Sequence, residues 1–233
     1  MNQTRAQRRA LTPVVMLILS ALLGFLLISR AAPAQGDQTT AGGHTHTAAL
    51  APRKAAQNAF HDQMRKVWED HITWTRLAIV TFADGSAGFN PTAGRLLQNQ
   101  TDIGDAIKPF YGAAAGNRLT ALLHDHITIA VEILQAASTD NTAAFNAANT
   151  RWYANGNDIA DFLAAANPRS WPDAVMRADM KEHLDQTLAE AAHELHGQYA
   201  ASVTDYEGIH AHILMMADQL SAGIIAQFPS HFR

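Results

Sequence analysis

The chain has 233 residues, no cysteine, twelve histidines and a formal net charge of −4. This length suits one or two domains with a sizeable core. Without cysteine the chain forms no disulfide, thiolate metal site, iron–sulfur cluster or cysteine nucleophile. Only 7% of the residues are aromatic, and the abundance of Ala and Leu favours closely packed helices over a β-sandwich.

The N-terminal segment is typical of an export signal. Three arginines precede an apolar run at residues 11–28, and small residues typical of a cleavage site follow at 32–34. We therefore expect residues 1–34 to be a cleaved signal peptide. The alternative is membrane attachment through residues 11–28. Either interpretation predicts an extracytoplasmic protein, secreted or held at the cell envelope.

The charge of the remaining chain excludes one class of partner. Residues 35–233 carry 13 Lys and Arg against 21 Asp and Glu, a net charge of −8. A nucleic-acid-binding protein needs the opposite balance. We therefore expect no nucleic-acid partner, and the sequence identifies no protein partner.

The pattern of apolar residues predicts one helical domain. Residues 35–55 are rich in Gly, Thr, Ala, Gln and Pro, which predicts a flexible tether. From Ala56 onward apolar residues recur at steps of three and four. Glycine, proline and asparagine interrupt this pattern often enough to define about six helices. The expected fold of residues 56–233 is thus an all-α, antiparallel up-and-down bundle.

The expected helices fall into three hairpins that repeat one pattern. Residues 68–73, 123–128 and 180–185 each read apolar residue, any residue, acid, His, branched aliphatic residue, then Thr or Asp. In the partner helices, residues 95–107 match residues 151–163 in the same register, and the third copy is looser. A repeat of this length indicates a bundle built from three copies of one helical hairpin.

Each copy places a histidine in the middle of its inward-facing stripe. Helical spacing directs these three side chains into the core. Residues equidistant from a turn lie at the same height in an antiparallel hairpin, so each histidine should face a polar partner. The central residues are His71, His126 and His183, and their expected partners are Asn99, Asn155 and His212.

This polar layer has three interpretations. Buried imidazoles and amides satisfy one another and fix the register of Ala-rich helices. Alternatively, imidazoles and carboxylates together bind Zn, Fe, Mn or Cu, as inward side chains of helical bundles do. A small organic ligand lying against Trp68, Trp74 and Trp152 is the third. The candidate metal ligands are His71, His126, His183, His212, Asp102 and Asp158, supported by Asn99, Asn155 and Glu190.

The remaining motifs point away from catalysis. No nucleophile–base set, phosphate-binding loop or dinucleotide fingerprint is visible. Glu190 with His193 and Glu207 with His210 have metal-ligand spacing but lie near the expected turn at Gly197, where solvated pairs are the better interpretation. The sequence therefore predicts a metal- or ligand-binding bundle of the cell envelope. A non-catalytic structural or interaction module is the alternative, and a metal-dependent oxidoreductase ranks last.

Four segments carry a resemblance to known sequences. Residues 68–76, 95–112, 151–168 and 216–229 resemble a group of uncharacterised bacterial exported helical proteins. The similarity extends over most of residues 60–229. It implies a single helical domain and brings no activity or site with it.

Overall fold

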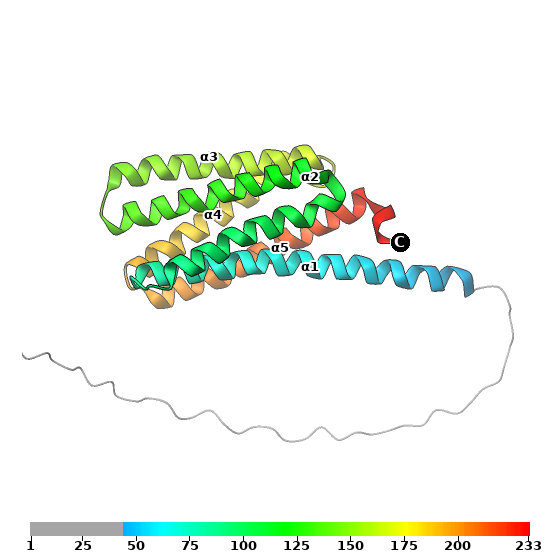
Figure 1. The fold of residues 1–233 in the computed structure, drawn as a ribbon, viewed down its shortest axis with the longest axis horizontal. Coiled ribbons are helices and arrows are strands. Elements are labelled where there is room, and N and C mark those ends of the chain that lie inside the picture. Colours follow the sequence, from blue (N-terminus) through cyan, green and yellow to red (C-terminus); the bar gives the residue numbers. More distant parts are fainter. Residues whose placement is uncertain (1–43) are drawn as a thin grey trace, which may run out of the picture. The chain divides into compact units, whose positions relative to one another are not determined.

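The computed structural model describes residues 44–233, with side chains from residue 53 onward. This part of the chain contains five α-helices, one short 3-10 helix and no strand, which confirms the expected all-α class (Figure 1). The elements are α1 (His44–Ala83), α2 (Phe89–Ser138), α3 (Thr142–Ala166), α4 (Asp173–Leu195), α5 (Tyr199–Gln227) and η1 (Pro229–Phe232).

The structure describes only part of the N-terminal region for which the sequence makes predictions. The expected signal peptide at 1–34 and the first residues of the expected tether lie outside the described residues. Since α1 begins at His44, residues 44–55 are helical, and the expectation that regular structure starts near Ala56 was wrong. The Ala- and Leu-containing stretch after His46 has a high enough helix propensity to extend α1 toward the N-terminus.

Five helices replace the expected six because α2 includes a sharp change of direction. Gly112 has φ 83° and ψ 167°, a conformation outside the helical region that glycine adopts at little cost. The two arms of α2, residues 89–111 and 113–138, fold back on each other at this point. They approach so closely that a Cβ on Gly104 would lie 2.6 Å from the carbonyl oxygen of Gly116.

Three other turns share one local geometry. Gly85, Asp140 and Gly197 all have positive φ, of 61°, 52° and 70°. In each turn the next residue donates its N–H to the carbonyl five residues back, which is the pattern of a helix-ending Schellman motif. The three bonds are Ser86 to Thr81 (2.9 Å), Asn141 to Ala136 (2.9 Å) and Gln198 to His193 (2.8 Å).

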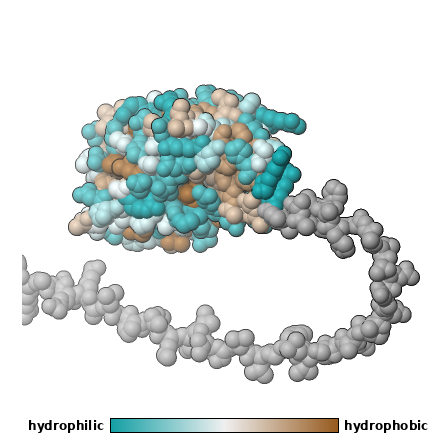
Figure 2. Space-filling view, turned by 45° about the vertical axis from the view of Figure 1, so that its right-hand side comes forward, coloured by the Kyte–Doolittle hydropathy of each residue, from teal (hydrophilic) through white to brown (hydrophobic). Residues whose placement is uncertain are grey.

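The helices close into a ring. Each packs against the next along the chain, and α1 also packs against α5 (Figure 1). Large apolar side chains from every α-helix fill the interior, among them Met64, Ile103, Ile159, Leu184 and Ile213, which are almost inaccessible to solvent. On the face seen in Figure 2, polar residues predominate and apolar ones form small groups. The ring thus surrounds one main apolar core, with two smaller apolar clusters around Leu96 and Leu134.

Among the described residues, α5 alone is long and apolar enough to cross a membrane. Half of its most apolar window is buried inside the bundle. A core helix of a globular domain has the same properties, so this is weak evidence for a membrane span.

Candidate functional site

Three imidazoles converge in the middle of the bundle. His71 comes from α1, His126 from the second arm of α2 and His183 from α4, and their exposed fractions are 3%, 3% and 5%. The ring centres of His71 and His183 are 5.8 Å apart. His126 also lowers the pKa values of His71 and His183. All three histidines that the sequence pattern directs inward are therefore buried.

Amide side chains form hydrogen bonds with the Nδ1 atoms of two imidazoles. His126 Nδ1 donates to Asn155 Oδ1 at 2.8 Å. His71 Nδ1 instead accepts from Gln100 Nε2 at 3.2 Å. His183 Nδ1 is buried and has no hydrogen-bond partner. The layer is therefore incompletely satisfied at His183.

The expected same-height partners occupy equivalent places. Each donates a hydrogen bond to the backbone carbonyl four residues before the central histidine of its hairpin. The bonds run from Asn99 Nδ2 to Val67 O (2.9 Å), from Asn155 Nδ2 to Leu122 O (3.0 Å) and from His212 Nε2 to Asp179 O (2.9 Å). These bonds fix the height of one helix against its neighbour in all three pairs.

Gln100 is a site residue that the sequence reasoning missed. The expected partner of His71 was Asn99, but the neighbouring Gln100 reaches its ring. Gln100 is fully buried, four residues after Leu96 and three before Ile103, on the inward stripe of the first arm of α2. That spacing was the available signal.

Burial keeps the imidazoles uncharged. Desolvation, and next the repulsion from His126, lower the pKa of His71 from 6.5 to about 3. Desolvation lowers the pKa of His126 to about 4, although the hydrogen bond with Asn155 opposes this change. The pKa of His183 falls well below its ordinary value through burial and the three neighbouring histidines. At neutral pH all three rings are therefore neutral and carry a lone pair.

The two candidate carboxylates lie apart from the histidines. Asp102, on the first arm of α2, forms an ion pair with Arg95 at 3.2 Å and accepts a hydrogen bond from Gln98 at 3.3 Å. Asp158 is exposed on α3. A step of three residues from Asn99 or Asn155 rotates a side chain by about 60° off the partner's direction, which is enough to turn both carboxylates toward solvent.

Glu190 belongs to a second buried polar group, closer to the Gly197 turn. Its carboxylate lies 2.5 Å from Arg76 Nη1, and the same nitrogen atom donates to Ser202 Oγ at 2.8 Å. Ser202 Oγ donates to Glu194 at 2.5 Å. Burial raises the pKa of Glu190 to about 7, although Arg76 opposes the change. The expectation that Glu190 is solvated was wrong, because positions 187, 190 and 194 continue the inward stripe of His183.

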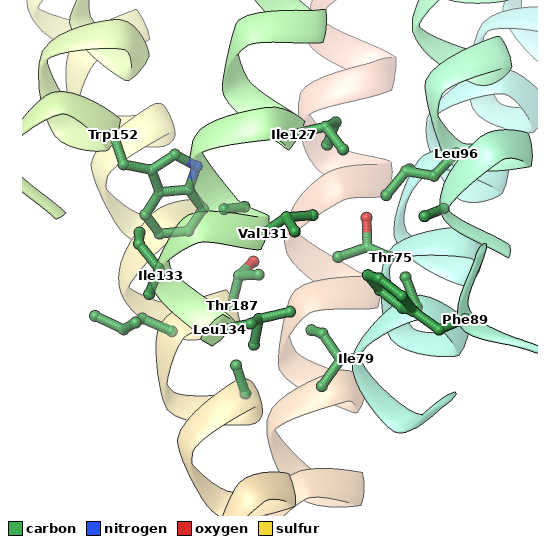
Figure 3. Close-up of a pocket in the computed structure, with 15 residues that line it drawn as sticks. Thr75, Ile79, Phe89, Leu96, Ile127, Val131, Ile133, Leu134, Trp152 and Thr187 are labelled. Atoms are coloured by element: carbon green, nitrogen blue, oxygen red, sulfur yellow. The ribbon is translucent and has the colours of Figure 1, made fainter. Parts of the chain in front are cut away.

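An apolar pocket lies one helical turn from the histidine layer, and Figure 3 shows the side chains that line it. Thr75, Ala130 and Thr187 line it, and each follows one of the three central histidines by one helical turn. The cavity volume available to the centre of a water-sized sphere is about 50 Å³. Trp152 lies at one side and Phe89 at the other in the close-up. Of the three tryptophans considered as ligand contacts, Trp152 is the one that lines this pocket.

The described residues contain no group of three or more His, Asp or Glu set in metal-ligating geometry. Fold and site together define an all-helical bundle with a buried histidine layer. No protein-family model, curated protein or solved structure matches the chain. The function is therefore argued from the site itself.

Proposed function

We propose that the protein binds a transition-metal ion at the layer formed by His71, His126 and His183. The observation that carries the proposal is the pair His71 and His183, with ring centres 5.8 Å apart and a buried, unpartnered Nδ1 on His183. Two imidazoles that share one tetrahedral ion at about 2.0–2.1 Å place their ring centres about 5 Å apart. The separation of the two ring centres is therefore within about an ångström of the value expected for a shared ion.

The hydrogen bonds around the layer also support metal binding. A metal-bound imidazole usually donates its other N–H to a carbonyl or carboxylate oxygen. His126 does so to Asn155, and His212 does so to the carbonyl of Asp179. Gln100 Oε1 is buried without a partner. Because Gln100 Nε2 also donates to the Leu96 carbonyl at 2.7 Å, His71 would bind the ion through Nε2 only after this amide moves.

The proposal requires small movements of side chains. Since no three ligands are already in place, at least one imidazole must rotate about its side-chain torsions when the ion enters. Asp102 and Asp158 lie outside the layer and are not part of the proposed ligand set. His212 is the available fourth ligand. A neutral all-imidazole set suits Zn, Cu, Fe or Ni better than Mg or Ca.

The test is metal analysis of protein purified without a histidine tag, paired with titration by Zn²⁺ and Co²⁺. We expect about one ion per chain and a tetrahedral Co²⁺ absorption spectrum. His183→Ala and His126→Ala should lose the ion, whereas His124→Ala should keep it because His124 lies off the layer on the same arm of α2. Binding that is absent from the wild type, or equal in all variants, would contradict the proposal.

A purely structural layer is the second candidate, favoured by the hydrogen bonds from Asn155 and Gln100. A packing role predicts an apo protein whose stability is unchanged by chelator. It also predicts that His126→Leu, which removes the hydrogen bond to Asn155, lowers stability without changing metal content. Denaturant unfolding with and without chelator separates the two candidates. An oxidoreductase would additionally need a redox-active ion with an open coordination position, which an absorption spectrum detects.

We also infer that the bundle derives from three copies of one hairpin and is exported. The repeat is supported by the equal separation of the central histidine and the positive-φ residue, at 71 and 85, 126 and 140, and 183 and 197. Export is supported by the sequence of residues 1–34. Mass spectrometry of the protein from its native envelope fraction tests the second inference, since a mature N-terminus near Gln35 is expected. An intact N-terminus would favour the anchor instead.

A further inference from the structure

The pocket one helical turn from the histidine layer exists because small side chains meet there. Ala78 of α1, Ala93 and Ala130 of the two α2 arms, and Ala191 of α4 all line it. Protein interiors are otherwise densely packed. Because four helical segments each place an alanine against the same space, the side chains at this height of the bundle are too small to fill it.

The polar groups in the pocket wall are already engaged with the backbone. Thr75 Oγ1 donates to the carbonyl of His71 at 2.7 Å, and Thr187 Oγ1 donates to that of His183 at 2.8 Å. The indole Nε1 of Trp152 donates to the carbonyl of His126 at 3.1 Å. Each central histidine thus receives a side-chain hydrogen bond on its own carbonyl, and these donors are no longer available to a ligand.

This arrangement defines the chemistry that the pocket accepts. No charged side chain is among its lining residues. Water needs two to four polar partners to be stable in a cavity, and an apolar cavity takes up apolar molecules instead. A charged ligand would lose its hydration without gaining a partner. We propose that this pocket is a binding site for an uncharged, apolar small molecule that packs against Trp152.

The pocket wall also offers an access route. Ile133, Leu134, Leu188 and Ala191 line both this pocket and a second, outer hollow bounded by α2, α3 and α4. The outer hollow is itself mainly apolar, with Phe145 and Leu195 among its residues. Those shared side chains form part of the wall between the two spaces. Rotation of Leu134 and Leu188 would therefore connect the two spaces.

The test is titration of the full chain with benzene and indole, followed by thermal unfolding and methyl NMR. We expect saturable stabilisation, since a ligand that binds only the folded state raises its stability, and shifts that centre on Ile133 and Leu134. Benzoate, which adds a charge to the same ring, should not bind. No response to benzene or indole, or an equal response to benzoate, would overturn the proposal.

Matched variants locate the site. Ala130→Leu fills the pocket and should weaken indole binding at least about tenfold, whereas Ala121→Leu, exposed on the same arm of α2, should leave it unchanged. Should Ala130→Leu fail to fold by circular dichroism, Ala93→Leu fills the same space from the other arm. Equal indole affinity in a folded filling variant and in Ala121→Leu would place binding elsewhere. His183→Ala should retain indole binding, so this proposal and the metal proposal fail independently.

Discussion

The ring centres of His71 and His183 are 5.8 Å apart in the middle of the bundle, and both side chains are buried. One comes from α1 and the other from α4, and His126 completes the layer from the second arm of α2. A proton added to any of these rings would create a charge in an interior that solvates it poorly and lies beside other imidazoles. The folded state consequently favours the neutral form of each imidazole. Protonation of these rings should therefore lower the stability of the fold in acid.

We expect the protein to lose stability as the pH falls below about 6.5. The pKa values of His71 and His126 are about 3 and about 4 in the fold, against 6.5 when exposed. The unfolded chain therefore binds protons first, and the stabilisation present above pH 6.5 is lost as the pH falls toward 4. Each ring contributes up to about 1.4 kcal/mol per pH unit. Urea unfolding at pH 7.5, 6.5, 5.5 and 4.5 measures this dependence.

His126→Gln isolates one ring, because an amide keeps a polar group at that position without titrating. The slope of unfolding free energy against pH should fall by up to about 1.4 kcal/mol per pH unit in this variant. His124→Gln, on the same arm of α2 but off the layer, is the control. A wild-type stability that is constant between pH 4.5 and 6.5 would show that the layer is accessible to protons.

Glu190 should contribute in the opposite direction. Its pKa is raised from 4.5 to about 7, chiefly by burial. The folded state therefore holds this proton more tightly than the unfolded state, and the resulting stabilisation is full below pH 4.5 and lost as the pH rises to about 7. Relative to Glu190→Gln, the wild type should lose up to about 1.4 kcal/mol per pH unit across this window. Urea unfolding of both proteins at pH 5 and 7 measures the difference.

Glu207→Gln on α5 is the control for this experiment, since Glu207 is exposed. It should leave the pH profile of the wild type unchanged. An identical pH profile for Glu190→Gln and wild type would mean that Glu190 stays ionised within the network of Arg76 and Ser202.

Asn155 should be the most sensitive amide of the layer. Its side chain accepts from His126 Nδ1 and donates to the Leu122 carbonyl. Asn155→Ala leaves the buried Nδ1–H of His126 without an acceptor and should cost about 2–4 kcal/mol. Denaturant unfolding measures the loss. The control is Asn157→Ala, an exposed position two residues further along α3, which should change stability by less than about 0.5 kcal/mol. Equal losses of stability in both variants would show that the Asn155 side chain does not stabilise the layer through His126.

Much of this arrangement was predictable because helical periodicity and turn signals act locally. The spacing of His71, His126 and His183 within apolar stripes directed them inward, and their distance from the turns gave the heights of Asn99, Asn155 and His212. These inferences need only 3.6 residues per turn and an antiparallel neighbour. The same periodicity contained the signal for Gln100 and Glu190, whose positions continue inward stripes.

The rest depends on which side of a neighbouring helix each residue meets. Asp102 and Asp158 follow the layer residues by three positions, which rotates them by about 60°. Whether that rotation leads to the core or to solvent depends on where the next helix of the ring lies. Arg76 reaches Glu190 across α1 and α4, elements far apart in the sequence. The apolar pocket arises from small residues of four segments, and no local pattern reveals their convergence. Side-chain direction and volume across the ring are therefore tertiary properties.

The crossing of the two α2 arms supplies the last prediction. A Cβ on Gly104 would lie 2.6 Å from the carbonyl oxygen of Gly116 and 2.0 Å from Thr120 Oγ1. Thr120 can rotate, but the backbone carbonyl moves only if the arms separate. Gly104→Ala should therefore destabilise the protein by about 1–3 kcal/mol. Gly94→Ala, on the first arm with nothing within 4 Å of the added methyl, should instead stabilise it by about 0.5–1 kcal/mol. Denaturant unfolding gives the change in unfolding free energy for each variant, and we expect the two changes to have opposite signs. Stabilisation by both substitutions would show that the arms do not cross at Gly104.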